Sequence, residues 1–137
     1  MRGWLARFLR RTENLGDAGE RQAADFLSQR GFRIIARQHS SRFGEIDLIA
    51  VDGDTLVFVE VKTRRTLSAG DPAEAITPRK QAQLTRVALA YLKRNGLLEQ
   101  RTRFDVVAVL SPADGTAPVV THYRDAFTPA GTGPMFA

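Results

Sequence analysis

The chain has 137 residues, a formal net charge of +5 and no cysteine. This length fits a single domain with its own hydrophobic core. Zero cysteine excludes a disulfide scaffold, a thiolate nucleophile and every cysteine-ligated metal site, and it is compatible with the cytoplasmic location that we expect. Because there are only two histidines, any metal must be held by carboxylate and carbonyl oxygens, which favours Mg²⁺ or Mn²⁺.

Arginine supplies 17 of the 20 basic side chains, and the three lysines are Lys62, Lys80 and Lys93. The planar guanidinium suits phosphate, so the composition indicates a polyanionic partner, with nucleic acid ahead of an anionic membrane surface. A composition that only keeps the protein soluble is the alternative. No apolar run approaches the ~20 residues that span a bilayer, so we expect a soluble protein without a membrane partner.

We expect three segments: a flexible basic arm over residues 1–13, one domain over 14–127 and a disordered tail over 128–137. The domain begins with a helix that Asn14 or Asp17 caps and that Gly31 ends.

Glu20 lies within the apolar stripe of this helix. Ala23, Ala24 and Leu27 follow it at i+3, i+4 and i+7, the spacing of one helical face. A carboxylate there must be paired, protonated or bound to a metal. The alternative is a hydrated first-turn Glu that the helix dipole favours.

Strands are predicted for residues 32–36, 45–51 and 55–62, with a polar link over 37–43 and an Asp-Gly-Asp hairpin turn over 52–54. Alternation assigns the side chains to faces. One face of the second strand has Ile46, Leu48 and Ala50, the other Glu45, Asp47 and Ile49; the third strand has Val57, Val59 and Val61 opposite Leu56, Phe58, Glu60 and Lys62.

Residues 63–77 predict a mobile loop, after which Thr77 caps a helix that ends near residues 95–96. Strands over 103–110 and 119–123 complete the domain. This order predicts an α/β fold in which a mixed sheet packs against helices. We expect His39 and His122 to be polar surface residues.

The candidate chemistry lies at Asp47, Glu60 and Lys62. The hairpin makes their strands neighbours, so the two carboxylates converge, and a divalent cation would relieve their repulsion. Glu60 and Lys62 share a face, which puts an ammonium beside a metal that could activate water against a phosphodiester. The alternative is a solvated Glu60–Lys62 pair with Asp47 accepting a turn hydrogen bond.

The segments Gly-Glu-Ile-Asp-Leu-Ile-Ala over 44–50 and Val-Phe-Val-Glu-Val-Lys-Thr-Arg over 57–64 resemble the signature of the YraN-like bacterial family. These proteins are similar to archaeal Holliday junction resolvases of the restriction-endonuclease-like, PD-(D/E)xK superfamily. The resemblance implies a three-layer sandwich with a mixed central sheet flanked by helices. It also implies Mg²⁺-dependent catalysis by Asp47, Glu60, Lys62 and Glu20, with Asp47, Glu60 and Glu20 as metal ligands.

Cations near these residues are candidates for phosphate contacts. They are Arg42, Arg64 and Arg65 beside the hairpin, Lys80 at a helix N-terminus and Arg37. Where the family usually has Arg-Asn-x-Arg, residues 37–40 read Arg-Gln-His-Ser, so one polar contact and one cation are missing.

The function expected from the sequence is a metal-dependent nuclease acting on DNA in preference to RNA, with branched or junction DNA among its substrates. Symmetric junction cutting would call for a homodimer. The alternative is a non-catalytic nucleic-acid-binding module on the same fold, within a repair, recombination or uptake complex.

Overall fold

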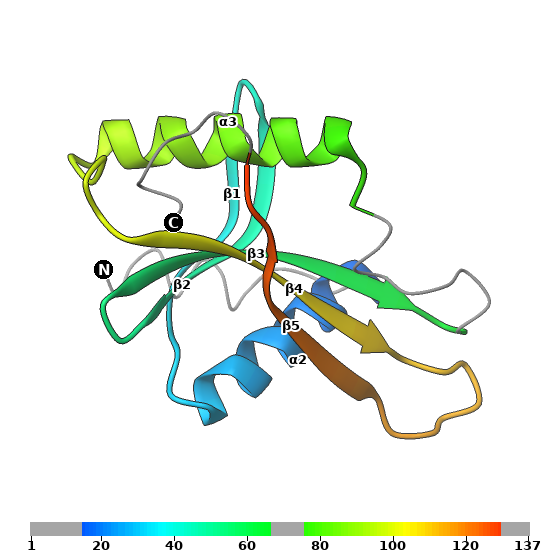
Figure 1. The fold of residues 1–137 in the computed structure, drawn as a ribbon. Helices are drawn as coiled ribbons and strands as arrows, with labels where there is room; N and C mark the ends of the chain where they lie inside the picture. The colour runs from blue at the N-terminus through cyan, green and yellow to red at the C-terminus, as the bar shows by residue number, and fades with distance from the viewer. Residues whose placement is uncertain (1–14, 67–75, 130–137) are drawn as a thin grey trace.

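The computed structural model describes residues 15–66 and 76–129, which form two helices and one five-stranded sheet (Figure 1). The elements are α2 (Leu15–Gln29), β1 (Arg33–Ser41), β2 (Gly44–Asp52), β3 (Thr55–Arg64), α3 (Pro78–Arg94), β4 (Thr102–Leu110) and β5 (Val119–Phe127). The predicted element order and the mixed α/β fold are confirmed. The expected arm, residues 67–75 of the expected loop and residues 130–137 of the expected tail lie outside the described residues.

The strands follow one another across the sheet in the order β1-β2-β3-β4-β5. Only β3 and β4 are parallel, and α3 connects them. A parallel pair needs such a long crossover, whereas β1–β2 and β2–β3 are joined by two-residue turns and β4–β5 by the loop over residues 111–118.

Three layers result, because the helices cover opposite faces of the sheet (Figure 1). The α2 core joins helix residues to alternate residues of the central strands: Ala23, Ala24, Leu27, Leu48, Ala50, Val57, Val59, Val107 and Val109. The α3 core contains Ile46, Ile49, Leu56, Phe58, Leu84, Val87, Ala88, Leu92 and Phe104. The expected three-layer arrangement is therefore present.

The predicted helix boundaries have a local explanation. Gly31 has φ +92°, and the Phe32 amide donates to the Leu27 carbonyl, as in a Schellman ending. Thr77 caps α3 by accepting a hydrogen bond from the Lys80 amide at 3.1 Å. The start of α2 at Leu15 puts Asp17 in the first turn, so Asp17 is not the cap.

The polar link predicted for residues 37–43 is wrong, since β1 continues to Ser41 and turns into β2 through residues 42–43. It pairs with β2 along this whole segment, from Arg37 opposite Leu48 to Ser41 opposite Gly44. Polar side chains are tolerated because β1 is an edge strand. A register shift between Ile34 and residue 36 and a left-handed Gln38 (φ +48°) conceal the alternation.

The face predicted for Ile46 is also wrong. Ile46 packs in the α3 core with Ile49, whereas Leu48 packs in the α2 core. Regular pairing between β2 and β3 ends at Leu48 opposite Val59. Beyond that pair β2 leaves the β3 ladder, so strict alternation no longer predicts where its side chains point.

A buried ionic cluster joins β4 to β5. The Asp105 carboxylate accepts hydrogen bonds from the Arg103 guanidinium at 2.9 and 3.1 Å and from the Asp125 amide at 3.0 Å, and it lies 2.8 Å from His122 Nε2. Arg103 also pairs with Asp52 at 2.9 Å. We call Asp52, Arg103, Asp105 and His122 the Asp105 network.

His122 is not the polar surface residue expected from the sequence, because it belongs to this network. The His122 side chain is only 9% exposed, because it lies against Asp105 and edge-on to Phe32. His39 is half-buried and edge-on to Tyr91.

Neither helix of the described chain is long and apolar enough to cross a membrane.

Candidate metal centre

The candidate site lies where β2 separates from β3. Two residues beyond Val59, the last regularly paired residue of β3, the Val61 amide donates a 2.7 Å hydrogen bond to Asp47 Oδ2 of β2. The side chain of Asp47 thus occupies the opening between the strands.

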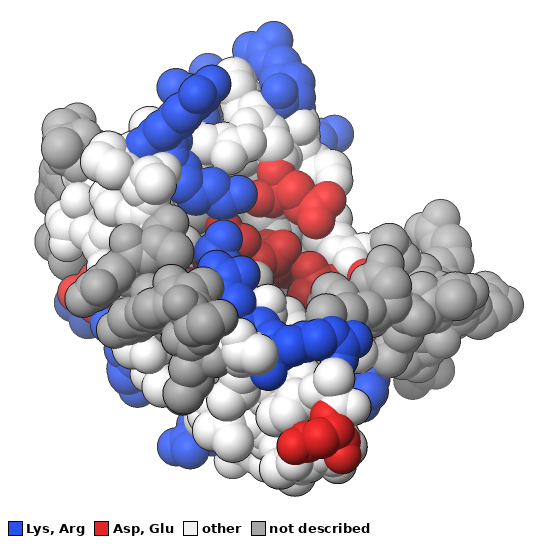
Figure 2. Space-filling view, turned by 90° about the vertical axis from the view of Figure 1, so that its right-hand side faces the viewer, with Lys and Arg blue, Asp and Glu red and all other residues white. Residues whose placement is uncertain are grey.

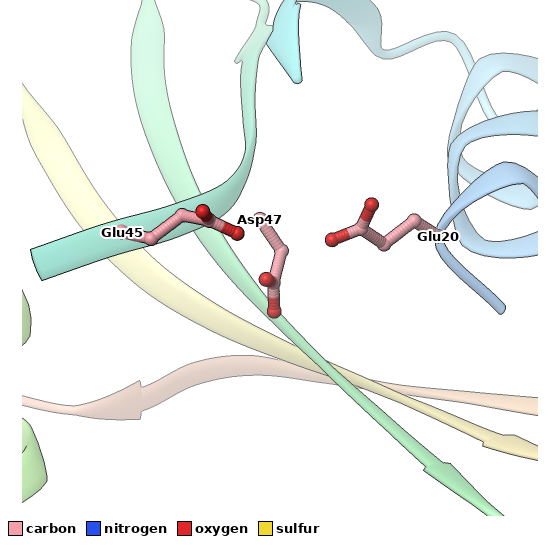
Figure 3. Close-up of side chains that lie close together, drawn as sticks. All are labelled: Glu20, Glu45 and Asp47. Carbon is pink, nitrogen blue, oxygen red and sulfur yellow. The ribbon is translucent and has the colours of Figure 1, made fainter. Parts of the chain in front are cut away.

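Carboxylates from three elements meet at this opening. Oxygens of Glu20 on α2 and of Glu45 and Asp47 on β2 lie within 4.8 Å of one another, and the three side chains point together in Figure 3. Asp47 is also hydrogen-bonded to Glu60 of β3. We call Glu20, Glu45, Asp47 and Glu60 the carboxylate cluster.

Burial raises the pKa of Glu20, Asp47 and Glu60, because water no longer solvates the ionised form. The pKa of Glu60 rises to about 8, through burial first and then through the hydrogen bond and negative charge of Asp47. At neutral pH Glu60 therefore retains its proton and donates a hydrogen bond to the Asp47 carboxylate. The positive charges of Lys80 and Lys62 oppose this rise.

Glu60 is only 8% exposed, so the alternative of a solvated Glu60–Lys62 pair is wrong. Its Oε2 atom is buried and has no hydrogen-bond partner in the described chain. Lys80 Nζ lies 3.4 Å from this oxygen, close enough for attraction. Glu60 is thus a buried acid with unused ligand capacity.

A single neutral side chain bridges two acids of α2. The Gln38 amide nitrogen donates to Asp17 Oδ1 at 2.7 Å and to Glu20 Oε2 at 2.6 Å. Its backbone adopts the left-handed conformation, which turns the amide towards α2. Gln38 stands where the resemblance called for Asn, and its longer side chain contacts two acids of α2 here.

Glycine allows α2 to approach the sheet closely beside Glu20. A Cβ on Gly19 would collide with the Thr63 hydroxyl of β3. The small residue therefore lets the helix bring Glu20 within reach of Asp47.

The cations predicted from sequence lie at different distances from the cluster. Lys80 reaches Glu60 directly, and half-buried Lys62 follows Glu60 by two residues on β3. Arg64 ends β3 with its Nε buried and without a hydrogen-bond partner in the described chain, and Arg65 follows, exposed.

The remaining two lie on the outer hairpin. Arg42 is at the tip between β1 and β2, with its guanidinium 4.8 Å from the centre of the Phe43 ring. Arg37 lies in β1, opposite Leu48 and half-buried.

The surface view shows acidic side chains gathered in a hollow, with basic side chains directly beside them (Figure 2). This arrangement gives an opening in which a cation could meet several oxygens, bordered by groups that attract phosphate.

Sequence reasoning missed Glu45 and Gln38 as members of the site. The sequence indicated Glu45 weakly, because alternation puts it on the predicted face of Asp47. Only its proximity to Glu20 in the structure distinguishes it from other exposed acids. Nothing in the sequence indicated Gln38, because its role depends on the left-handed backbone within β1.

Comparison with known proteins places these residues in a family. Residues 19–109, which include the whole carboxylate cluster, match the model of the uncharacterised protein family UPF0102. A UPF0102 protein of Rhodococcus jostii is 50% identical over 113 residues, or 82% of this chain and 95% of that protein.

Other relatives agree. A UPF0102 protein of Symbiobacterium thermophilum is 54% identical over 104 residues, covering 76% of this chain and 88% of that protein. One of Geobacter sulfurreducens is 50% identical over 115 residues, covering 82% and 88%. The YraN-like resemblance is therefore confirmed, and the chain belongs to the UPF0102 family.

Proposed function

We propose that this protein is a metal-dependent nuclease that hydrolyses phosphodiester bonds in DNA, within the PD-(D/E)xK superfamily and similar to archaeal Holliday junction resolvases. One observation carries the proposal: acids from α2, β2 and β3 converge where the sheet opens, beside Lys62 and Lys80. Concentrated negative charge repels phosphate, so a binding module alone would have no use for it.

The donor set fits Mg²⁺ or Mn²⁺. Its members are carboxylate oxygens, the ligands these hard cations prefer. Glu60 Oε2 is buried without a hydrogen bond, and a cation would satisfy it. Asp47, Glu60 and Glu20 would hold the metal, as expected from the sequence, and Glu45 is the added candidate.

A bound Mg²⁺ supplies charge neutralisation at the scissile phosphate and lowers the pKa of water. The chain's own groups would do the positioning. Lys62, on the same face of β3 as Glu60, would orient the attacking water or stabilise negative charge that develops on the phosphate. Lys80 would hold an adjacent phosphate through its ammonium.

The test is cleavage of labelled branched, single-stranded and linear duplex DNA, and of RNA, with Mg²⁺, Mn²⁺ or chelator. We expect metal-dependent cleavage that Asp47→Asn and Lys62→Ala reduce at least a hundredfold. Asp25→Asn, an exposed acid elsewhere on α2, is the matched control and should cleave normally.

Cleavage that survives in chelator or in Asp47→Asn would contradict the proposal. A wild-type protein that never cuts, while both variants retain nucleic-acid binding, would favour the non-catalytic module. The same substrates rank DNA against RNA. Sedimentation in the presence of a junction would test the homodimer that symmetric cutting needs.

A further inference from the structure

Helix α3 has an unusual charge composition. Its 17 residues include five cations, Arg79, Lys80, Arg86, Lys93 and Arg94, and no acid. Surface helices commonly gain stability from acid–base pairs at i,i+4, and α3 has none. Two of the cations lie in its first turn, where the helix dipole disfavours positive charge. The dipole favours Lys93 and Arg94 in the last turn, but it explains neither the two first-turn cations nor Arg86.

The cations recur on one side of the helix. Arg79, Arg86 and Lys93 are spaced by seven residues, which is within about 20° of two full turns. All three are exposed, while Leu84, Val87, Ala88 and Leu92 point to the core. The outer face of α3 is thus a basic stripe about 21 Å long, at 1.5 Å per residue.

The β1–β2 hairpin turns this stripe into a groove of about 980 Å³. The hairpin rises past α3 in Figure 1, and its tip and the helix form the two walls. Arg42 comes from the tip, and Arg86, Lys93 and Arg94 come from the helix, with no acidic residue in the lining. Within residues 15–66 and 76–129, no ion pair neutralises any of these four side chains.

The first turn of α3, where the stripe starts at Arg79, lies beside the carboxylate cluster through Lys80. Lys80 lies 3.4 Å from Glu60, and Lys93 is 13 residues farther along α3, about 20 Å away. Phosphates on one DNA strand advance 3.4 Å along the duplex axis per nucleotide, so this distance corresponds to about six base pairs.

We propose that the groove binds the sugar–phosphate backbone of duplex DNA over about six base pairs, leading away from the bond cleaved at the carboxylate cluster. This inference rests on the proposed function for the position of the DNA relative to the cleaved bond, and on charge complementarity for the choice of DNA as the ligand. The contacts are to phosphate and are independent of base sequence. The apolar part of the groove, which includes Phe43, Leu89 and Leu98, would pack against sugars.

The test compares two variants that remove three charges each. The groove variant is Arg86→Ser, Lys93→Ser and Arg94→Ser. The matched control is Arg30→Ser, Arg33→Ser and Arg101→Ser, exposed cations outside the groove. Binding of a fluorescent 24-base-pair duplex is measured by anisotropy in chelator across a salt series, after circular dichroism confirms folding.

We expect the groove variant to bind at least tenfold more weakly at 100 mM salt. Its slope of log affinity against log salt should be shallower by about 2–3, since each lost phosphate contact removes about 0.9. The control should bind within threefold of wild type. Lysine at positions 86 and 94 should restore affinity, because charge and not shape is required.

Equal weakening in both variants would overturn the inference, because the effect would then be one of overall charge. Unchanged binding in the groove variant would overturn it while leaving any cleavage by wild type intact. Lost duplex binding in a protein that never cuts would support the groove and refute the nuclease. Binding of a polyglutamate peptide that the groove variant loses, with duplex binding kept, would assign the groove to an acidic protein and overturn the inference.

Discussion

Two buried groups of charged side chains on the same sheet treat negative charge in opposite ways. In the Asp105 network, one carboxylate faces Arg103, His122 and the Asp125 amide, and its pKa is lowered even though burial acts to raise it. In the carboxylate cluster, acids face one another and burial dominates, so the pKa of Glu60 rises to about 8.

The difference distinguishes charged groups that stabilise the fold from charged groups that are available to a ligand. Balanced partners make the Asp105 network complete, so it links β4 to β5 and has nothing to gain from a ligand. The carboxylate cluster has more acids than nearby cations and a buried Glu60 oxygen that accepts no hydrogen bond in the described chain. A protein tolerates such an imbalance where a cation completes it.

The largest expected effect on the free energy of unfolding comes from removing the charge of Asp105. Asp105→Asn leaves the Arg103 charge and His122 without their buried partner, which should lower the free energy of unfolding by about 3–5 kcal/mol at pH 7. Urea unfolding measures it, with Asp25→Asn as the exposed control. Because the folded pKa of Asp105 lies below 3.8, the deficit should persist at neutral pH and shrink only as pH falls below that value. A loss under 1 kcal/mol would mean that the network contributes little to stability.

A divalent metal should stabilise the protein through the carboxylate cluster and not through the Asp105 network. At a Mn²⁺ concentration one hundred times its Kd, binding to the native state should raise the free energy of unfolding by about 2.7 kcal/mol. The rise should be absent in Asp47→Ala and present in Asp25→Asn, and calorimetry should show the matching loss of Mn²⁺ uptake. Unchanged uptake by Asp47→Ala would remove the metal site.

Neutralising Glu60 should stabilise the metal-free protein, the reverse of the result at Asp105. Between about pH 4.5 and pH 8 the folded state holds a proton on Glu60 that the unfolded chain has released, so stability falls as pH rises through this window. Glu60→Gln removes that dependence and should gain up to about 4 kcal/mol at pH 8 in chelator, with little gain at pH 4.5. Urea midpoints at the two pH values decide it, and a gain that does not grow with pH would contradict the raised pKa.

The sequence predicted the carboxylate cluster better than the Asp105 network, for a physical reason. Alternation on two strands joined by a short turn puts Asp47 and Glu60 near each other across the hairpin, and the helical stripe turns Glu20 towards the sheet, so local patterns indicate all three residues. His122 and Asp105 are on strands whose pairing is irregular between Phe104 and Val106. No local pattern predicts a partner across such a bulge.

The limits within the carboxylate cluster have the same origin. The hairpin at residues 52–54 and the ends of both helices were predictable because turn and cap residues act locally. The separation of β2 from β3 after Leu48 and the left-handed Gln38 were not, since both depend on three-dimensional packing. Those two features decide how Asp47 and Glu20 are held.

The smallest expected effect is at Gln38. Replacing this residue by a cation would give the carboxylate cluster the charge balance of the Asp105 network. The neutral Gln38 amide donates hydrogen bonds to Asp17 and Glu20, whereas in the Asp105 network a charged guanidinium donates to the carboxylate. Gln38→Arg would supply a cation to two acids and should raise the stability of the metal-free protein by about 1 kcal/mol. The same charge should compete with metal, weakening Mn²⁺ binding about tenfold by calorimetry and slowing cleavage in proportion. Gln38→Met, neutral and of similar length, is the control and should not gain stability. If Gln38→Arg gained stability with unchanged Mn²⁺ affinity, Glu20 would not be a ligand, and the excess charge on α2 would need another explanation.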